Sequence, residues 1–196
     1  MAEYVSLDID IRAATKADVP LILSLIKDLA RYEKLLDQVV ATEAILQESL
    51  FGPSPRAEVI IGSVQGIPVG YALFFHSYST FLGKSGMYIE DLYVQNAHRG
   101  KGLGKALLMY VAELAIKRGC KRLEWSVLDW NEPAIRFYES LGAVPMNGWT
   151  LYRLAGKTLD TLLTSCGSKT FSAQTACRRG RQDIYHLEKN YDPETI

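Results

Sequence analysis

The most informative segment of the chain is Arg99-Gly100-Lys101-Gly102-Leu103-Gly104. The apolar, aromatic residues 87–94 before it are typical of a strand. Apolar residues then recur at helical spacing, at Leu103, Leu107, Tyr110, Val111 and Leu114. Glycines at a strand-to-helix turn let the backbone come close to a ligand, and a helix N-terminus attracts anions. Because Arg99 and Lys101 add positive charge, we expect a phosphorylated ligand at this turn.

The spacing of the glycines argues against two common nucleotide-binding loops. A Walker A loop needs Gly-x-x-x-x-Gly-Lys-Ser/Thr, but Arg99 stands at its first glycine position and Ala106 at its hydroxyl position. A dinucleotide loop needs Gly-x-Gly-x-x-Gly, whereas these glycines fall at positions 100, 102 and 104. Glu124 lies about 20 residues further on, as a ribose-binding acid does, but near the start of the next expected strand. An oxidoreductase or nucleotide-binding protein is therefore the weaker alternative.

Apolar periodicity predicts alternating strands and helices. We expect helices at 16–34, 42–50, 102–117 and 132–140, the first capped by Thr15 or Asp18 and the last by Asn131. Strands are expected at 9–12, 58–64, 69–76, 87–95, 121–128 and 149–154, with a tight turn at Gln65-Gly66. These elements predict a mixed sheet with helices on both faces. Residues 165–196 are polar and lack apolar periodicity, so we expect a mobile tail after a domain at 9–164.

The composition is that of an ordinary globular protein. Lys+Arg and Asp+Glu number 22 each, so no basic field is expected to bind nucleic acid or an acidic membrane. The N-terminus has no basic-then-apolar run, and three scattered cysteines indicate a reducing compartment, which together predict a cytoplasmic protein. The three histidines are scattered as well, so no metal is expected.

The glycine segment, with the pattern Arg-x-x-Gly-x-Gly, resembles the acetyl-CoA pyrophosphate loop of the GCN5-related N-acetyltransferase (GNAT) family. Tyr88-Ile89-Glu90-Asp91-Leu92-Tyr93-Val94 resembles the family's central strand, and Asp129-Trp130-Asn131-Glu132-Pro133-Ala134 with Phe137-Tyr138 resembles its later strand–helix unit. Segments 30–34, 37–39, 78–80 and 148–149 are similar to a narrower group, the diamine (spermidine/spermine-type) and thialysine acetyltransferases. The resemblance extends over residues 9–160.

This resemblance implies the GNAT fold, an α/β (α+β) architecture with a mixed, mostly antiparallel central sheet and helices on both faces. It also implies acetyl-CoA as cosubstrate, a small-molecule amine as acceptor, and a homodimer. The backbone of Leu92 and Val94 is expected to bind the pantetheine arm and the acetyl carbonyl. The positions that match the family's acetyl-CoA site are Leu92, Tyr93, Val94, Arg99, Gly100, Lys101, Gly102, Leu103, Gly104, Lys105, Asn131, Glu132, Pro133 and Ala134.

Two side chains are candidates for proton transfer. Tyr138 matches the family's proton donor to the CoA thiolate, although a tyrosine on an amphipathic helix is also a common core residue. A phenol with a pKa of about 10 protonates a thiolate only with help from its orientation and surroundings. Glu90, which precedes Asp91 inside an apolar strand, matches a residue that contacts the substrate amine and helps to deprotonate it. On the pattern alone, an internal cation or an exposed strand end explains this pair of carboxylates equally well.

The acceptor site implied by the resemblance is acidic and aromatic. Glu33, Glu90 and Asp91 supply negative charge, which favours a cationic amine over a neutral arylamine. Ser79 stands where polyamine-acetylating relatives carry an acidic residue, which favours a lysine-like amine such as thialysine over spermidine or spermine. Two other functions stay open at this point: acetylation of lysines on proteins, and non-catalytic binding of CoA or a nucleotide. The matching acceptor positions are Tyr32, Glu33, Glu90, Glu124, Trp125 and Ser126.

Overall fold

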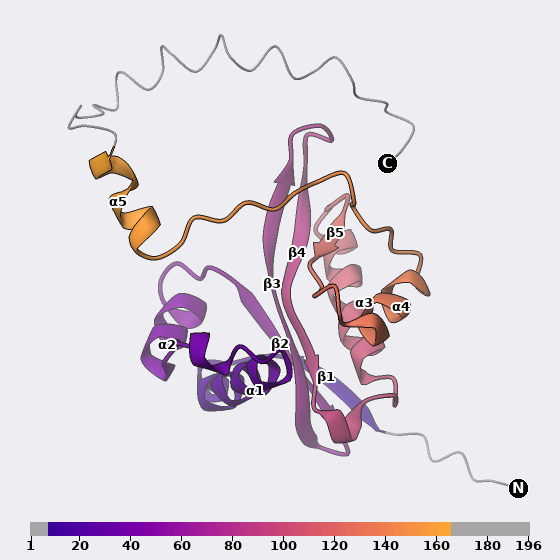
Figure 1. The fold of residues 1–196 in the computed structure, drawn as a ribbon. Helices are drawn as coiled ribbons and strands as arrows, with labels where there is room; N and C mark the ends of the chain where they lie inside the picture. The colour runs from indigo at the N-terminus through magenta and orange to yellow at the C-terminus, as the bar shows by residue number, and fades with distance from the viewer. Residues whose placement is uncertain (1–7, 166–196) are drawn as a thin grey trace, which may run out of the picture. The chain divides into compact units, whose positions relative to one another are not determined.

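The computed structural model describes residues 8–165 of the 196-residue chain (Figure 1). The chain divides into two compact units between Leu141 and Gly142. The first unit holds the sheet and the helices that cover it, and the second holds an irregular segment and a short helix. The expected polar tail at 165–196 lies outside the described residues, apart from Ser165.

A five-stranded sheet forms the centre of the first unit. Its strands lie side by side in sequence order; the first three pairings are antiparallel, and the last, between β4 and β5, is parallel. The expected mixed, mostly antiparallel sheet is therefore confirmed. The strands are β1 (Ile9–Ala13), β2 (Glu58–Val64), β3 (Ile67–Ser79), β4 (Lys84–Val94) and β5 (Leu123–Trp125).

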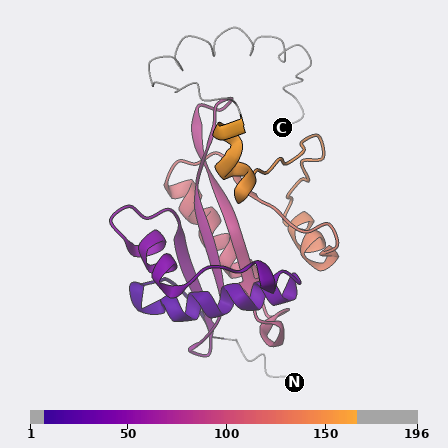
Figure 2. The ribbon, with the colours of Figure 1, turned by 60° about the vertical axis from the view of Figure 1, so that its left-hand side comes forward.

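Helices cover both faces of this sheet, as Figures 1 and 2 show. Side chains of α1 and α2 form one core with Tyr71 and Tyr93, which we call the α1 core. Side chains of α3 form a second core with Phe74 and Ile89 on the opposite face, which we call the α3 core. The helices are α1 (Val19–Tyr32), α2 (Glu43–Phe51), α3 (Leu103–Lys117) and α4 (Glu132–Glu139), and 3-10 turns span Lys16–Asp18, Leu36–Gln38 and Asn96–His98.

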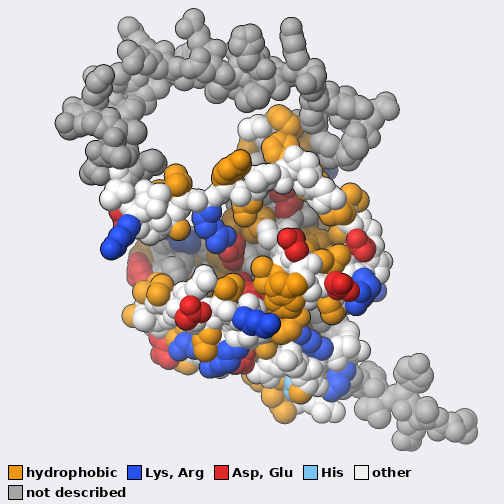
Figure 3. Space-filling model, in the orientation of Figure 1, with side chains coloured by type: hydrophobic (Ala, Val, Ile, Leu, Met, Phe, Trp, Pro, Cys, Tyr) orange, Lys and Arg blue, Asp and Glu red, His pale blue; other side chains and the backbone are white. Residues whose placement is uncertain are grey.

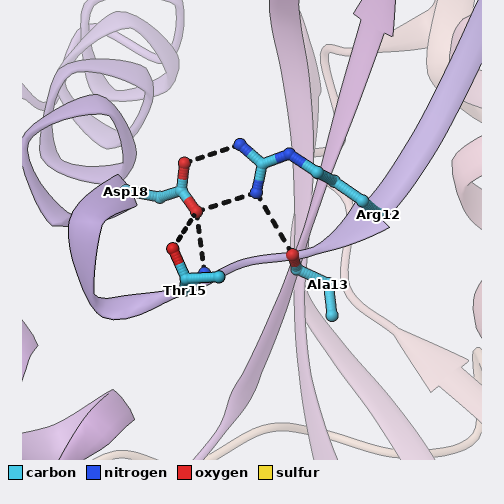
Figure 4. A network of polar contacts seen from close by, with 4 residues as sticks. All are labelled: Arg12, Ala13, Thr15 and Asp18. Atoms are coloured by element: carbon cyan, nitrogen blue, oxygen red, sulfur yellow. Dashed lines mark hydrogen bonds and ion pairs between the residues drawn. The ribbon is translucent and has the colours of Figure 1, made fainter.

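The entry into α1 is held by polar contacts around Asp18 (Figure 4). The Asp18 carboxylate accepts hydrogen bonds from the Thr15 backbone N–H at 2.7 Å and the Thr15 hydroxyl at 2.9 Å. Arg12 of β1 donates to both carboxylate oxygens, at 2.7 and 2.8 Å, and also to the Ala13 carbonyl. The hydrogen bonds from Arg12 lower the pKa of Asp18 below its ordinary value. The network therefore ties β1 to the turn before α1 and satisfies a backbone N–H near the helix start.

A β-bulge interrupts β4 at Glu90. Leu73 of β3 lies opposite Asp91, and the next residue, Phe74, lies opposite Ile89. Glu90 is therefore the extra residue, without a partner on β3. A bulge bends the strand and ends regular pairing, and here it falls inside the segment that was expected to hold the site.

The bulge also reverses the alternation of side chains along β4. Before it, Ile89 packs in the α3 core; after it, Leu92 and Val94 pack there, although they are an odd number of residues away. Tyr93 correspondingly packs in the α1 core. Because side chains alternate between the two faces, Asp91 lies on the α1 face of the sheet.

Several expected boundaries agree with the structure, and two do not. The strand at 58–64 is confirmed, and the turn at Gln65-Gly66 has positive φ at both residues, 52° and 76°. The strand expected at 121–128 is only Leu123–Trp125, because β5 pairs with Met87–Ile89 alone. The strand expected at 149–154 is wrong. Its side chains are largely exposed and no strand among residues 8–165 pairs with them, and a helix, α5 (Lys157–Ser165), follows instead.

Candidate functional site

The glycine segment forms the turn between β4 and α3 that the sequence predicts. Gly102 precedes the first residue of α3 with φ 92°, and Gly100 has φ 72°, a conformation that favours glycine. A Cβ on Gly100 would meet no atom within 4 Å, and one on Gly104 would come no closer than 3.8 Å to Val94 Cγ2. The turn is therefore open beside a helix N-terminus, which fits the pyrophosphate of acetyl-CoA.

Leu103 anchors this turn to the sheet. Its side chain is buried in the α3 core, and a Cβ on Gly62 of β2 would stand only 2.7 Å from Leu103 Cδ1. Gly62 therefore lets α3 lie close to the sheet, which fixes where the helix begins. Because its side chain is buried, Leu103 can contact a ligand only through its backbone.

Three cationic side chains lie at the turn, and two of them donate hydrogen bonds to backbone carbonyl groups. Arg99 Nε donates to the Val94 carbonyl at 2.8 Å, so its charge lies at the end of β4. Lys101 Nζ donates to the Ala97 carbonyl at 3.0 Å. Lys105 projects from the first turn of α3 and is exposed. Positive charge thus surrounds the helix start, as an anion site requires.

One edge of β4 is without a strand partner beyond Ile89. β5 pairs only with Met87–Ile89, and the described residues provide no other strand on that side. The unpaired part runs from Glu90 to Val94 and ends beside the glycine turn. It contains Leu92, Tyr93 and Val94, whose side chains pack in the two cores while their backbone lies along this edge. An extended ligand arm can pair with such an edge as a strand does.

Tyr32, the last residue of α1, joins three segments. Its hydroxyl donates to Asn131 Oδ1 at 3.0 Å, and its ring centroid lies 5.6 Å from that of Trp130. The Arg99 guanidinium lies over the same ring, 4.1 Å from the centroid. Asn131 is the N-cap residue of α4, as expected, but its side chain forms no capping hydrogen bond. Its amide oxygen accepts from Tyr32 instead. Tyr32, an expected acceptor residue, therefore contacts two expected acetyl-CoA residues, Asn131 and Arg99.

The other positions on α4 that were expected to bind acetyl-CoA form its first turn. Glu132, Pro133 and Ala134 follow Asn131 directly, and proline there is compatible with a helix start because it lacks only an N–H that would be unpaired anyway. Glu132 is exposed and forms an ion pair with Arg136 at 2.8 Å. This turn therefore presents a second helix N-terminus on the same side of the sheet as α3.

Tyr138 lies on α4 and packs against the α3 core. Its ring centroid is 4.9 Å from that of Trp125 and 5.3 Å from that of Phe137. Burial raises the pKa of Tyr138 above its ordinary value, so the phenol stays protonated at neutral pH. Its hydroxyl forms no hydrogen bond with any residue from 8 to 165, which leaves the proton available to a ligand.

Three carboxylates lie where α1 ends beside the bulge. Asp91 is partly buried and accepts a hydrogen bond from the Tyr71 hydroxyl at 2.8 Å. Burial raises the pKa of Asp91, and the hydrogen bond from Tyr71 opposes this rise. Burial, and then the charge of Asp91, raise the pKa of Glu33 at the end of α1. Glu90, on the bulge, is exposed; none of the three forms an ion pair with Lys or Arg within the described chain, so an internal cation does not explain them.

The three β5 positions have different surroundings. Glu124 forms an ion pair with Arg122 at 2.7 Å, so its charge is already compensated. Trp125 packs on Tyr138 in the α3 core. Ser126 shares a hydrogen bond of 2.7 Å with the Tyr88 hydroxyl across the β4–β5 pair. Of the three, only Trp125 contacts the candidate proton donor.

Sequence reasoning missed Tyr71, which lies in β3 and is 0% exposed. A tyrosine within an apolar strand counts as a core residue by periodicity, and its hydroxyl partner depends on the register between two strands. The only available signal was the carboxylate pair on the expected neighbouring strand, which needs a buried donor or a cation.

Several features bear on other kinds of ligand. Figure 3 shows Lys and Arg interspersed with Asp and Glu on the face drawn, with no extended field of one sign among its described residues. Between residues 8 and 165, no three His, Cys, Asp or Glu side chains gather as a metal site requires. In the same part of the chain, no helix has the length and apolar character needed to cross a membrane.

Comparison with known proteins shows the family to which the sequence is similar. Residues 25–143 match the model of the acetyltransferase (GNAT) family. The chain is 39% identical over 163 residues to a thialysine N-epsilon-acetyltransferase of Bos taurus, an alignment that covers 78% of this chain and 95% of that protein. It is 34% identical over 197 residues to an L-ornithine N5-acetyltransferase of Arabidopsis thaliana, with 78% and 86% covered.

A solved structure supports the same fold. An integron cassette protein of V. cholerae matches with a TM-score of 0.67 and 27% sequence identity. The match covers 79% of this chain and 96% of that one. The fold of this chain is therefore shared with a solved structure, over nearly the whole length of that solved protein.

Proposed function

This chain belongs to the acetyltransferase (GNAT) family and is an N-acetyltransferase, and we propose that it transfers the acetyl group of acetyl-CoA to a primary amine of a small cationic molecule. The observation that carries the proposal is the bulge at Glu90. It lies where β4 loses its β5 partner, and Glu90 is one of three carboxylates, with Glu33 and Asp91, that form no ion pair with a Lys or Arg of residues 8–165. An edge for acetyl-CoA and a charged site for an amine therefore meet at one residue.

The proposal assigns the two substrates to opposite faces of the sheet. Tyr138 and Trp125 pack in the α3 core, on the face where the glycine turn begins α3. Asp91 and Glu33 lie on the α1 face. The amine approaches from the α1 face and attacks the thioester directly at the strand edge, so no protein side chain carries the acetyl group.

Each proton has a proposed carrier. A primary amine is cationic at neutral pH and must lose a proton before it attacks; Glu90 accepts this proton, directly or through one water. The new C–N bond replaces the C–S bond, and the departing thiolate takes a proton from Tyr138. The raised pKa of Tyr138 keeps the phenol protonated until that moment.

The acceptor that we propose is a lysine-like diamino acid such as thialysine. A cationic substrate compensates the carboxylates near the bulge, whereas a neutral arylamine leaves them unpaired. Ser79 is a neutral residue and therefore supplies no negative charge for a polyamine. Its side chain is buried, and its hydroxyl accepts from the Leu82 backbone N–H at 3.3 Å. The two relatives described above are named for thialysine and for L-ornithine, which are both diamino acids. On the family resemblance we further propose a cytoplasmic homodimer.

An amine panel with acetyl-CoA tests this function, with release of free CoA thiol as the readout. Thialysine is expected to have a higher kcat/KM than spermidine or spermine, because an ion pair missing from a partly desolvated site costs about 1–3 kcal/mol, which corresponds to about 5- to 150-fold. In competition for limiting acetyl-CoA, faster acetylation of spermidine contradicts the acceptor assignment. Glu90→Gln should slow the reaction, whereas Glu113→Gln, an exposed carboxylate on α3, should not. Absence of acetylation with every amine contradicts the function itself.

A further inference from the structure

Tyr71 is a fully buried tyrosine whose only polar atom on the side chain faces the acceptor site. It is 0% exposed, and its hydroxyl donates to Asp91 Oδ2 at 2.8 Å. Its ring packs in the α1 core, 6.5 Å from the Tyr93 ring in an edge-on arrangement. A buried hydroxyl that neither solvent nor substrate can reach acts through the group to which it donates, which here is a carboxylate.

The register of the sheet places the two side chains together. Tyr71 pairs with Tyr93, and Leu73 pairs with Asp91, so Tyr71 and Asp91 are diagonal neighbours on the same face of β3 and β4. This arrangement depends on the bulge, since an uninterrupted β4 would turn Asp91 to the α3 face. The bulge therefore brings Asp91 to a buried donor, Tyr71, and close enough to Glu33 for the two carboxylates to interact electrostatically.

Asp91 forms no ion pair with a Lys or Arg in the described part of the chain. The charged or titratable groups that act on it are Tyr71 from β3, Glu33 from α1 and Glu90 from its own strand. Two of these three are carboxylates, which disfavour a further negative charge. The hydrogen bond from Tyr71 is the one interaction among them that favours the ionised form of Asp91.

We propose that Tyr71 is a positioning residue of the acceptor site: its hydroxyl holds the Asp91 carboxylate towards Glu33, and these two carboxylates bind the ammonium group of a diamine that is not acetylated. This inference rests on the proposed function. It gives the carboxylates different roles. Glu90, on the exposed bulge, accepts the proton of the amine that reacts, and Asp91 and Glu33 bind the amine that stays charged. Tyr71 thereby sets the preference for acceptors with two amino groups.

The test compares a diamine with a monoamine of the same chain length, 1,5-diaminopentane and pentylamine. Tyr71→Phe removes the hydroxyl and keeps the ring. It should raise KM for the diamine about tenfold to a hundredfold and change kcat/KM for the monoamine less than about threefold. The acid limb of the kcat/KM profile for the diamine should move to higher pH, because Asp91 loses the donor that favours its ionised form. A purely structural role would instead weaken both amines equally and leave the pH profile in place.

Asp91→Asn provides the second arm, because an asparagine can still accept from Tyr71. It should reproduce the selective loss for the diamine, and Tyr71→Phe combined with Asp91→Asn should be no worse than Asp91→Asn alone. Equal loss for both amines in Asp91→Asn overturns the proposal even if Tyr71→Phe fails to fold. Wild-type enzyme that acetylates neither amine nor any other in the panel refutes the proposed function instead, so the two failures are distinguishable.

Discussion

Replacing Tyr138 with phenylalanine removes one oxygen atom and leaves the ring in place. The ring contacts with Trp125 and Phe137, at 4.9 and 5.3 Å between centroids, are retained. The lost hydroxyl has no hydrogen-bond partner in the part of the chain that the structure describes. We therefore expect the free energy of unfolding to change by less than about 0.5 kcal/mol.

The expected effect of Tyr138→Phe on turnover is much larger. A general acid contributes about 10²–10⁴-fold to a rate, so kcat should fall by that factor, which corresponds to about 2.7–5.5 kcal/mol of transition-state stabilisation. Acetyl-CoA affinity should change little, because the proton is needed only as the C–S bond breaks. This gap between a small effect on stability and a large effect on turnover distinguishes a proton donor from a core residue.

Thiol release, calorimetric titration with CoA and thermal unfolding, measured on one preparation, check this expectation. Tyr110→Phe, which removes the hydroxyl of a partly exposed tyrosine on α3, is the matched control and should leave kcat unchanged. Since burial raises the pKa of Tyr138, ionisation of this phenol should not reduce the wild-type rate below about pH 10. A Tyr138→Phe enzyme that turns over at the wild-type rate would refute the assignment and place the proton donor elsewhere.

Asp18→Asn should lower the free energy of unfolding by about 1–2 kcal/mol at pH 7 in urea melts, because it weakens the ion pair with the half-exposed Arg12 and the contacts that cap the turn. Folding lowers the pKa of Asp18, so this stabilisation is present above about pH 4 and should shrink progressively as the pH falls further. A difference in unfolding free energy between wild type and Asp18→Asn that stays constant at low pH would contradict this expectation. Gly104→Val should weaken CoA binding about tenfold or more by calorimetry. The circular dichroism spectrum should not change, since Gly104 is helical and the nearest atom to a Cβ there is 3.8 Å away. Unaltered affinity would show that the turn does not bind CoA. Tyr32→Phe should raise the Kd for CoA about two- to fivefold through loss of the hydrogen bond to Asn131, and the effect should vanish in an Asn131→Ala background.

Features that depend on local sequence were predictable. The turn at Gln65-Gly66 needs two residues with positive φ, and the glycine turn before α3 needs positive φ at Gly100 and Gly102; both leave a signature in neighbouring residues. The family resemblance likewise picked out Tyr32 and Asn131 separately. That the hydroxyl of one donates to the amide of the other, 99 residues along the chain, required the structure.

Features that depend on pairing between distant strands were not predictable. No residue type marks the bulge at Glu90, because it arises from how β4 aligns with β3. The segment 149–154 carries strand-forming residues, yet a strand needs a partner, and the described residues offer it none. Tyr71 shows the same limit, since its role follows from the register that makes it a diagonal neighbour of Asp91.

The unpartnered part of β4 also bears on how the protein behaves at high concentration. A strand edge with free N–H and C=O groups can pair with the edge of another chain and so begin aggregation. Acetyl-CoA lying along that edge would cap it as a neighbouring strand does, in addition to stabilising the folded state by mass action. The protein should therefore stay monodisperse longer in light scattering when CoA is present, even at temperatures where both samples remain fully folded. The strand edge that we propose for the cosubstrate is then also an edge exposed to self-association between catalytic cycles.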